Sequence, residues 1–430
     1  MKAAFYTLGC KVNQCETEYI TELFKKNGYE IVNYTEKSDI YVINSCTVTA
    51  TADQKTRQSI RKFKRNHPES IVILTGCMPQ AYESNAAELS EADIVISNKE
   101  NSKIIDYLNQ YLSSCQRLVH IDKHSSGEKF DECKITSFGK RIRAFVKIED
   151  GCDRFCSYCI IPISRGRVRS KPLNDLKDEV KSLAENGIKE IVLVGINLSS
   201  YGKGENFNIV DSVKICAETD GIERVRLGSL EPDHITDEII ENLSEIEKFC
   251  PQFHISLQSG CDKTLKSMNR HYTSAEYREL CEKLRKTFSD CSLTTDVVTG
   301  FCGETEEDFN DSLNFVKSIS FEKVHVFPYS ERPGTAASKL GKDLPKQLKE
   351  QRANILIKEN DKIRENYFRS LTGETKEVLF ENFVDGYNIG YTKNYVPVKV
   401  KGEENLVSTT KKVRITDFSG CDFCFGEIVL

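Results

Sequence analysis

Three cysteines lie close together in the segment GCDRFCSYC, at Cys152, Cys156 and Cys159. The residues before them, RAFVKIED, predict a β-strand, so the cysteines occupy a loop at the carboxyl end of a strand, where barrels of alternating strands and helices carry their reactive groups. Three thiolates without a nearby histidine cannot complete a tetrahedral zinc site. Common iron–sulfur clusters take four cysteines, so this loop triplet favours a cluster with one iron left open for another ligand.

A second set of cysteines is dispersed along the chain, but each member has the same place relative to a predicted strand. Cys10 follows AAFYTLG, Cys46 follows IYVINS and Cys77 follows IVILTG. The carboxyl ends of parallel strands meet at one sheet edge, so this strand-end triplet can converge on one site, again with an open fourth position. Free cysteine is also a common buried residue, and the spacing alone leaves open three unconnected buried thiols.

The other eleven of the 17 cysteines show no spacing that predicts a metal site. Cys421 and Cys424 form a CxxC pair, but residues 371–430 contain no other cysteine and no histidine that would complete a zinc site. An odd number of cysteines without a secretory signal does not indicate a disulfide framework. We therefore expect metal chemistry at the two triplets and mostly ordinary packing elsewhere.

The composition is that of a globular protein. Its 430 residues suffice for about three domains, and 39% of them are hydrophobic. The formal net charge is −5, so a nucleic acid would have to be bound by local basic patches. No apolar run approaches the roughly 20 residues of a membrane helix, and the amino terminus does not read as a signal peptide. We expect a cytoplasmic protein with no membrane partner.

Short apolar runs alternate with helical patterns over most of the chain, which predicts an α/β protein. The central part contains six strand–helix units, fewer than the eight of a closed barrel, and the last part has only strand patterns and turn residues. We expect four segments: a parallel-sheet domain at 1–114, a linker at 115–137, a partial (βα)6 barrel at 138–368 and a small all-β barrel at 371–430. Helices are predicted near 14–27, 51–66, 100–112 and 345–370.

Several motifs carry a resemblance to a known family. The loop triplet, with the aromatic Tyr158 before its third cysteine, resembles the radical S-adenosylmethionine superfamily. The pattern TLGCKVNQ…INSCTVT…TGC, followed by that loop and a TRAM-like barrel, resembles the methylthiotransferase family over essentially the whole chain. INSCTVTATADQKTRQSIRK resembles the branch that acts on N6-threonylcarbamoyladenosine in tRNA. Two positions depart from the pattern without removing a ligand: Cys302, where proline is expected, and Cys15.

The resemblance implies a radical enzyme that replaces an unactivated C–H hydrogen by a methylthio group. The loop triplet would hold a 4Fe-4S cluster whose open iron binds S-adenosylmethionine and, when reduced, cleaves it to a 5′-deoxyadenosyl radical. That reaction needs the low end of the range of about −700 to +450 mV spanned by iron–sulfur clusters. The strand-end triplet would hold a second, auxiliary 4Fe-4S cluster that carries the sulfur. An external electron donor and a sulfur source would be partners.

The implied substrate is N6-threonylcarbamoyladenosine at position 37, beside the anticodon in the tRNA anticodon stem-loop. N6-isopentenyladenosine in tRNA and an aspartate of ribosomal protein S12 are the alternative substrates within the family. A non-catalytic iron–sulfur protein that binds RNA or transfers electrons is a different class, which the open iron positions disfavour because electron carriers normally saturate their clusters with four cysteines.

Polar residues and glycines at the predicted strand ends are candidates for binding S-adenosylmethionine. They share a position around the loop triplet, although such residues often only cap local structure. The candidates are Tyr158, Gly195, Asn197, Ser229, Glu231, Gln258, Ser259, Asp296 and Arg270. Arg270 is also a candidate for an RNA contact, its alternative being a surface helix cap.

Two basic segments are candidates for binding tRNA. Residues 140–171 contain nine basic side chains and three acidic ones, and Arg165, Arg167 and Arg169 in SRGRVRSK are expected to contact phosphates. Arg57 and Arg61 share a face of the predicted helix after Cys46, so either could pair with the substrate carboxylate or simply with phosphates.

The resemblance gives the carboxyl-terminal barrel an RNA-binding role as well. Aromatic side chains on small barrels of this kind stack on single-stranded bases. Tyr387, Tyr391, Tyr395 and Phe380 are candidates, and packing inside the barrel is the alternative.

Overall fold

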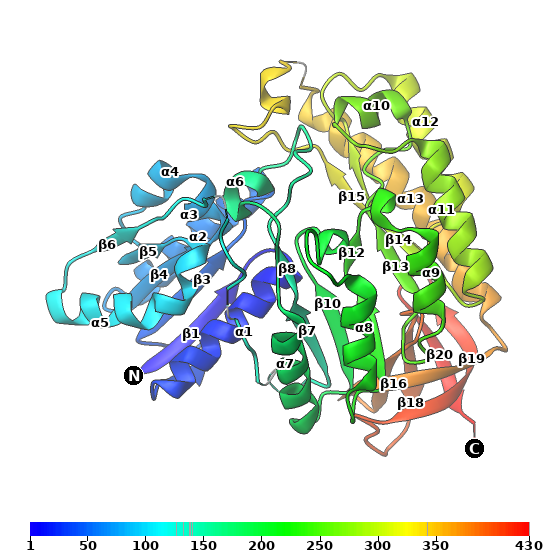
Figure 1. Ribbon diagram of the computed structural model, residues 1–430, viewed down its shortest axis with the longest axis horizontal. Coiled ribbons are helices and arrows are strands. Elements are labelled where there is room, and N and C mark those ends of the chain that lie inside the picture. The colour runs from blue at the N-terminus through cyan, green and yellow to red at the C-terminus, as the bar shows by residue number, and fades with distance from the viewer. Residues whose placement is uncertain (126, 132, 137–138, 140, 342, 430) are drawn as a thin grey trace.

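The computed structural model describes residues 1–125, 127–131, 133–136, 139, 141–341 and 343–429 (Figure 1). The chain begins with a six-stranded parallel sheet in the order β2-β1-β3-β4-β5-β6. Its central strands are the uninterrupted runs IYVINS and IVILTG, every residue of which is buried, as expected where helices cover both faces of a parallel sheet. The strands are β1 (Lys2–Thr7), β2 (Glu30–Val32), β3 (Ile40–Ser45), β4 (Ile71–Gly76), β5 (Ile94–Ile96) and β6 (Leu118–His120).

The three predicted helices of this domain are present, with two short ones besides. The helices are α1 (Lys11–Lys26), α2 (Ala50–Asn66), α3 (Cys77–Ala81), α4 (Glu83–Ala87) and α5 (Ile104–Ser114). Strand β6 is a difference from the expectation, because it lies in the segment 115–137 that we expected to be a linker and pairs with β5 through Ile94 and Leu118. Three residues are too few to show an alternating pattern. The expected boundary at 137–138 lies outside the described residues.

The central part is an open barrel of parallel strands. One sheet has the order β11-β10-β7, the next has the order β12-β13-β14-β15, and a bridge between Val225 and Phe249 joins them. No pairing between β7 and β15 occurs in the described part of the chain, so the predicted partial barrel is confirmed. The strands are β7 (Arg143–Lys147), β10 (Glu190–Val194), β11 (Arg224–Leu227), β12 (Ser229–Leu230), β13 (Gln252–Ile255), β14 (Ser292–Thr299) and β15 (Lys323–Pro328).

Helices line the outside of this open barrel, and Figure 1 shows the long α13 (Lys346–Ser370) running behind the last strands. The helix predicted at 345–370 is thus confirmed. The others are α7 (Leu173–Glu185), α8 (Ile209–Glu218), α9 (Asp237–Ser244), α10 (Asp262–Ser267), α11 (Ser274–Thr287) and α12 (Glu306–Ile319).

The carboxyl-terminal part is the expected small all-β barrel, closed in the order β16-β17-β18-β20-β19. Phe380 and Cys424 lie fully buried in its core. The strands are β16 (Thr375–Val384), β17 (Tyr387–Thr392), β18 (Pro397–Lys401), β19 (Thr410–Ser419) and β20 (Phe423–Ile428). Across the residues that the structure describes, no helix is long and apolar enough to cross a membrane.

The small barrel docks on the amino ends of the central strands through tyrosines and arginines. The rings of Tyr391 and Tyr395 stack at 4.6 Å, and the guanidinium groups of Arg143 and Arg226 lie over them. Arg226 also donates to the main-chain oxygen of Lys393. Tyr391 and Tyr395 are therefore part of a domain interface, which corrects their assignment as candidate stacking platforms for RNA.

Candidate active site

The strand-end triplet comes together at one edge of the amino-terminal sheet. Asn13, in the first turn of α1, accepts a hydrogen bond from the thiol of Cys10 at 3.3 Å, and its amide nitrogen lies 4.0 Å from the sulfur of Cys77. Cys46 closes the group, since a Cβ added to Gly9 would lie 3.0 Å from the Cβ of Cys46. Residues up to 67 positions apart in the chain thus face one site, because the three strands that precede them are neighbours.

The loop triplet lies between β8 (Glu149–Asp150) and α6 (Ile161–Arg165), at the carboxyl end of β7. The loop folds back on itself: the N–H of Cys152 donates to Gly166 and the N–H of Cys159 donates to Cys156, both at 3.0 Å. Burial raises the pKa of Cys152 to about 12, and the neighbouring thiol of Cys156 adds to this, although the Arg154 N–H opposes it. Such thiols become thiolates when a metal binds them.

The spacing of the sulfurs fits a polynuclear cluster. Among the described side chains, neither triplet brings its three sulfurs within 4.8 Å of one another. A single zinc ion with Zn–S bonds of about 2.3 Å would need them closer. The wider spacing leaves room for an iron–sulfur cluster, and three cysteines would leave one of its irons open.

A buried arginine contacts the strand-end triplet. Arg165, the last residue of α6, is 1% exposed and its Nε donates to the sulfur of Cys77 at 3.3 Å. Its other nitrogens form an ion pair with Glu16 of α1, with Nη2 and Oε2 3.0 Å apart. The pKa of Cys77 is raised to about 12 by burial, and Arg165 opposes that rise. Arg165 thus favours a thiolate at Cys77 and joins α6 to α1.

The loop triplet has an arginine of the same kind. Nη1 of Arg270 donates to the sulfur of Cys156 at 3.2 Å, and the guanidinium forms an ion pair with Glu231. Beside it, Tyr158 packs against Phe301 with ring centroids 6.3 Å apart. Tyr158, Glu231 and Arg270 therefore lie together beside the loop triplet, as their candidacy for cofactor binding requires.

The structure corrects the expectation for two of the three arginines in SRGRVRSK. Arg165 is buried as described, and Arg169 has a 7% exposed side chain that donates to the carbonyl oxygen of Arg165 and pairs with Asp150. Both are used inside the protein and are not available to phosphates. Arg167, with a 62% exposed side chain over the ring of Phe155, remains a candidate for RNA contact.

Comparisons with known proteins agree with this arrangement. Residues 2–97 match the Uncharacterized protein family UPF0004, and residues 146–316 match the Radical SAM superfamily. The chain is 37% identical over 99% of its length to the threonylcarbamoyladenosine tRNA methylthiotransferase MtaB of Bacillus subtilis, covering 96% of that protein. It is 34% identical over 98% of its length to the tRNA-2-methylthio-N(6)-dimethylallyladenosine synthase of Clostridium novyi, covering 92% of it. This chain belongs to the radical SAM methylthiotransferase family.

Solved structures share the fold. The radical S-adenosylmethionine methyltransferase TsrM from Kitasatospora setae, with cobalamin and a [4Fe-4S] cluster bound, superposes with a TM-score of 0.54 at 14% identity, over 90% of this chain and 80% of that one. The chain is therefore an MtaB-type radical SAM methylthiotransferase.

The remaining cofactor candidates of this methylthiotransferase line the same barrel end, but some have structural roles. Ser259 is fully buried and its hydroxyl accepts from the N–H of Cys261, while Asp296 pairs with His254 at 3.2 Å. Gln258, with a φ of +66°, donates from its main-chain nitrogen to Asp296. The candidates in or just after β10, β12, β13 and β14 are Gly195, Asn197, Ser229, Gln258, Ser259 and Asp296.

Glu149, directly before the loop triplet in β8, is a residue that the sequence reasoning missed. It is fully buried, burial raises its pKa well above the ordinary value, and its Oε2 accepts from the N–H of Asn197 at 2.6 Å. Gly195 makes room for it, since a Cβ there would lie 2.6 Å from Oε2. Oε1 of Glu149 and Oδ1 of Asn197 are buried without a described partner, which fits a polar ligand at this end of the barrel. The sequence did contain a signal for this residue, because Glu149 is an acidic side chain at the end of the predicted strand that precedes the loop triplet.

Of the two candidate arginines of α2, Arg61 does not lie beside the cysteines. Arg61 pairs with Glu91 at 3.1 Å and has a 60% exposed side chain. It lies eleven residues past Ala50, the first residue of α2, or about 16 Å along the helix at 1.5 Å per residue. Arg57 is partly buried on the same helix. The expectation that Arg61 reads a substrate carboxylate next to Cys46 is not supported by this position.

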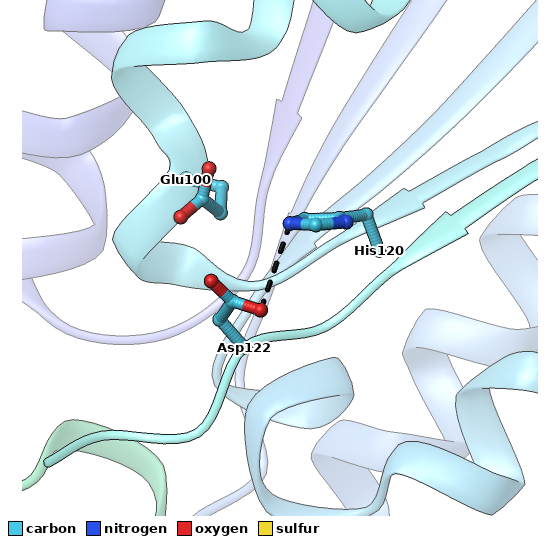
Figure 2. Close-up of side chains that lie close together, drawn as sticks. All are labelled: Glu100, His120 and Asp122. Carbon is cyan, nitrogen blue, oxygen red and sulfur yellow. Dashed lines mark ion pairs between the residues drawn. The ribbon is translucent and has the colours of Figure 1, made fainter.

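One further group of possible metal ligands lies away from the cysteines, where β6 meets the segment before α5 (Figure 2). His120 and Asp122 form an ion pair at 3.6 Å beside the buried Glu100. The carboxylate of Glu100 already pairs with Lys103 at 3.0 Å and accepts from Tyr107 at 3.1 Å. The group is therefore explained by its own ion pairs.

Proposed function

We propose that this enzyme converts N6-threonylcarbamoyladenosine at position 37 of tRNA to its 2-methylthio derivative, using two 4Fe-4S clusters. The observation that carries the proposal is the convergence of Cys10, Cys46 and Cys77 around Asn13, which gives a second open three-cysteine site besides the loop triplet. Relatives named as threonylcarbamoyladenosine methylthiotransferases, at 36–38% identity over at least 91% of the chain, support the substrate.

Each set of residues has a separate task in this proposal. The loop triplet would hold the cluster that binds S-adenosylmethionine, and the strand-end triplet would hold the auxiliary one. When bound, the clusters supply the electron that cleaves S-adenosylmethionine and the sulfur that is transferred. Arg270 donates a hydrogen bond to the sulfur of Cys156 in the loop triplet, and Arg165 donates one to the sulfur of Cys77 in the strand-end triplet. Each arginine thus places a positive charge next to one sulfur of its triplet. An external electron donor and a sulfur source complete the reaction.

Two buried arginine contacts connect the parts of the chain that carry the two cysteine triplets. Arg165 links the helix that follows the loop triplet to Cys77. On another side, Arg332 in the loop after β15 pairs with Asp53 and donates to Thr47, the residue after Cys46, at 2.9 Å. Because both contacts are buried, the two triplets are held by rigid groups rather than by exposed loops.

The test compares anticodon stem-loop RNAs that carry threonylcarbamoyladenosine, isopentenyladenosine or plain adenosine at position 37. The reconstituted, reduced enzyme receives S-adenosylmethionine and a sulfur source, and the nucleosides are measured by mass spectrometry. We expect methylthiolation of the threonylcarbamoyl RNA in strong preference to the others. A product only on the isopentenyl RNA would overturn the substrate. Absence of 5′-deoxyadenosine would favour a non-catalytic iron–sulfur protein instead.

A further inference from the structure

A cavity of about 440 Å³ lies between the inside of the open barrel and the small β-barrel, and the mechanism above leaves it unused. It extends from the first residue of α1 across β7 and β11 to β13 and β15. Its wall carries five cationic, two imidazole and two acidic side chains, together with the aromatic rings of Phe145, Tyr391 and Tyr395. The residues that matter here are Lys11, Phe145, Arg226, His254, Lys323 and His325.

The cavity includes residues of β15, the last strand of the open barrel. Along β15, Lys323, His325 and Phe327 are exposed, whereas Val324 between them is buried. Successive side chains of a strand point to opposite faces, so one face of β15 packs against the protein and the other stays uncovered. β15 is the edge strand of its sheet and packs on α13. Its uncovered face carries two polar side chains and one aromatic ring.

Most of the charges around this cavity are already balanced. Arg226 pairs with Glu190 at 3.1 Å, Arg364 pairs with Glu322 at 3.4 Å, and His254 pairs with Asp296. Arg143 lies between Glu190 and Glu381. These arginines therefore serve the structure rather than a ligand.

Two lysines are different. Lys11 and Lys323 have no ion-pair partner among the described residues, and the Nζ of Lys11 lies 5.7 Å from the centre of the Phe145 ring. One carboxylate of the wall, Asp422 in the turn between β19 and β20, also lacks an ion pair within the described part of the chain. The cavity consequently carries an excess of positive charge, which suits an anionic group of a ligand.

One wall residue of the cavity, Lys11, directly follows Cys10 of the strand-end triplet. If the sulfur is transferred at that triplet, the reacting purine must bind next to it, and a substituent on the purine can extend toward Lys11. A carboxylate there forms a charge-assisted bond with the ammonium group. An apolar prenyl group in the same place would leave the lysines unpaired and partly dehydrated, which is unfavourable.

We propose that this cavity binds the carboxylate of the substituent on N6 of the substrate, and that Lys11 is the specificity-determining residue that pairs with it, with Lys323 as a second cation. The inference rests on the proposed function and deepens it. It also places recognition of the substrate carboxylate in this cavity instead of on helix α2. The exposed Phe327, with 46% of its surface accessible, lies on the same face of β15 as Lys323 and offers a ring for the base.

The experiment measures binding of the cluster-loaded enzyme to anticodon stem-loop RNA with threonylcarbamoyladenosine or plain adenosine at position 37. For Lys11→Gln we expect the affinity for the threonylcarbamoyl RNA to fall about tenfold or more, the size expected for a lost bond to a charged group, with the affinity for plain RNA unchanged. Lys11→Arg should restore most of the preference. Lys25→Gln, an exposed lysine at the other end of α1, is the matched control and should behave as the parent.

Iron content and 5′-deoxyadenosine formation are measured on the same samples, because Lys11 adjoins Cys10. If Lys11→Gln loses iron, Lys323→Gln replaces it as the deciding variant, and we expect a loss specific to the threonylcarbamoyl RNA there too. An unchanged preference, or an equal loss for both RNAs, would overturn the inference and leave the proposed function standing. If the parent enzyme neither prefers nor methylthiolates threonylcarbamoyl RNA, the proposed function itself fails.

Discussion

Arg165 follows the loop triplet by six residues and reaches Cys77 of the strand-end triplet with its side chain. Its partner Glu16 is 3% exposed, so truncating the arginine leaves a buried carboxylate with Lys147 at 3.4 Å as its remaining cation. We expect Arg165→Ala to destabilise the protein by about 3–5 kcal/mol, the usual cost of breaking a buried ion pair. Arg165→Lys should recover part of that stability.

Thermal unfolding of the unloaded protein measures this difference without interference from the clusters. Arg167→Ala is the matched control, two residues away and largely exposed, and should change stability by no more than about 0.5 kcal/mol. If Arg165→Ala and Arg167→Ala unfolded at the same temperature, the buried position of Arg165 would be contradicted.

His325 lies on the wall of the barrel cavity, and its protonation decides which groups supply the cavity's charge. Partial desolvation inside the cavity lowers its pKa to about 4, and His254, Lys323 and Lys11 act in the same direction against the opposing effect of Asp296. Because the folded pKa lies below that of an unfolded histidine, His325 stays neutral down to about pH 4. It therefore favours unfolding as the pH falls from about 6.5 toward 4.

Nuclear magnetic resonance of isotope-labelled histidine follows this titration directly, with His325→Gln assigning the signal. We expect the imidazole of His325 to remain neutral at pH 6, so that Lys11 and Lys323 carry the positive charge. A midpoint near pH 6.5 would show a solvated ring and would contradict the electrostatic account of the cavity.

Among single residues, the convergence of the cysteines was predictable from sequence, whereas the burial of Arg165 and Arg169 was not. Cys10, Cys46 and Cys77 could be placed together because each follows a strand of one parallel sheet, and strand ends are local signals. Arg165 and Arg169 could not, because their burial depends on contacts between segments far apart, such as the pair 149 residues apart formed by Glu16 and Arg165. A basic run looks the same in sequence whether it faces solvent or another domain.

Among the elements, the loop after β15 connects the central barrel to the start of α2. Arg332 in this loop is 3% exposed, pairs with Asp53 and lies over the ring of Tyr82 at 5.0 Å. We expect Arg332→Ala to lower methylthiolation at least tenfold while S-adenosylmethionine cleavage continues, because the sulfur site loses its position relative to the radical site. Products of both reactions are quantified in one assay.

Glu331→Ala is the control, since this neighbour in the same loop is exposed. The conservative variant Arg332→Lys should restore part of the coupling. Equal losses of 5′-deoxyadenosine and of methylthiolated product would show that the loop supports the whole core instead of the relative placement of the two sites.

The element pattern was largely predictable, because buried parallel strands appear as continuous apolar runs and charged helices show their own period. The central strands β3 and β4 and the helix α13 agree with the expected ranges. Strand β6 was missed because three residues are too few to show a periodicity. Its extended conformation depends on pairing with β5. Contacts between elements of different domains, such as those of Arg332, produce no pattern in the local sequence and could not be predicted.

For the whole molecule, three folded parts contribute to one candidate site. The amino-terminal sheet supplies one cysteine triplet, the open barrel supplies the other, and the small β-barrel contacts the barrel strands through Tyr391 and Tyr395. Those tyrosines were predicted only as core or RNA-binding residues, because a domain interface cannot be derived from strand patterns. The order of the three folded parts along the chain was predictable from the patterns of apolar runs and helices.

The central claim is that two separate clusters divide the work, and variants of the two triplets test it most directly. Cys152→Ala should abolish 5′-deoxyadenosine formation. The triple variant Cys10→Ala, Cys46→Ala and Cys77→Ala should keep roughly four of about eight irons per chain, continue to cleave S-adenosylmethionine and lose methylthiolation. The deciding measurement is iron content together with both products on threonylcarbamoyl RNA. Methylthiolated nucleoside formed by the triple variant would contradict the account.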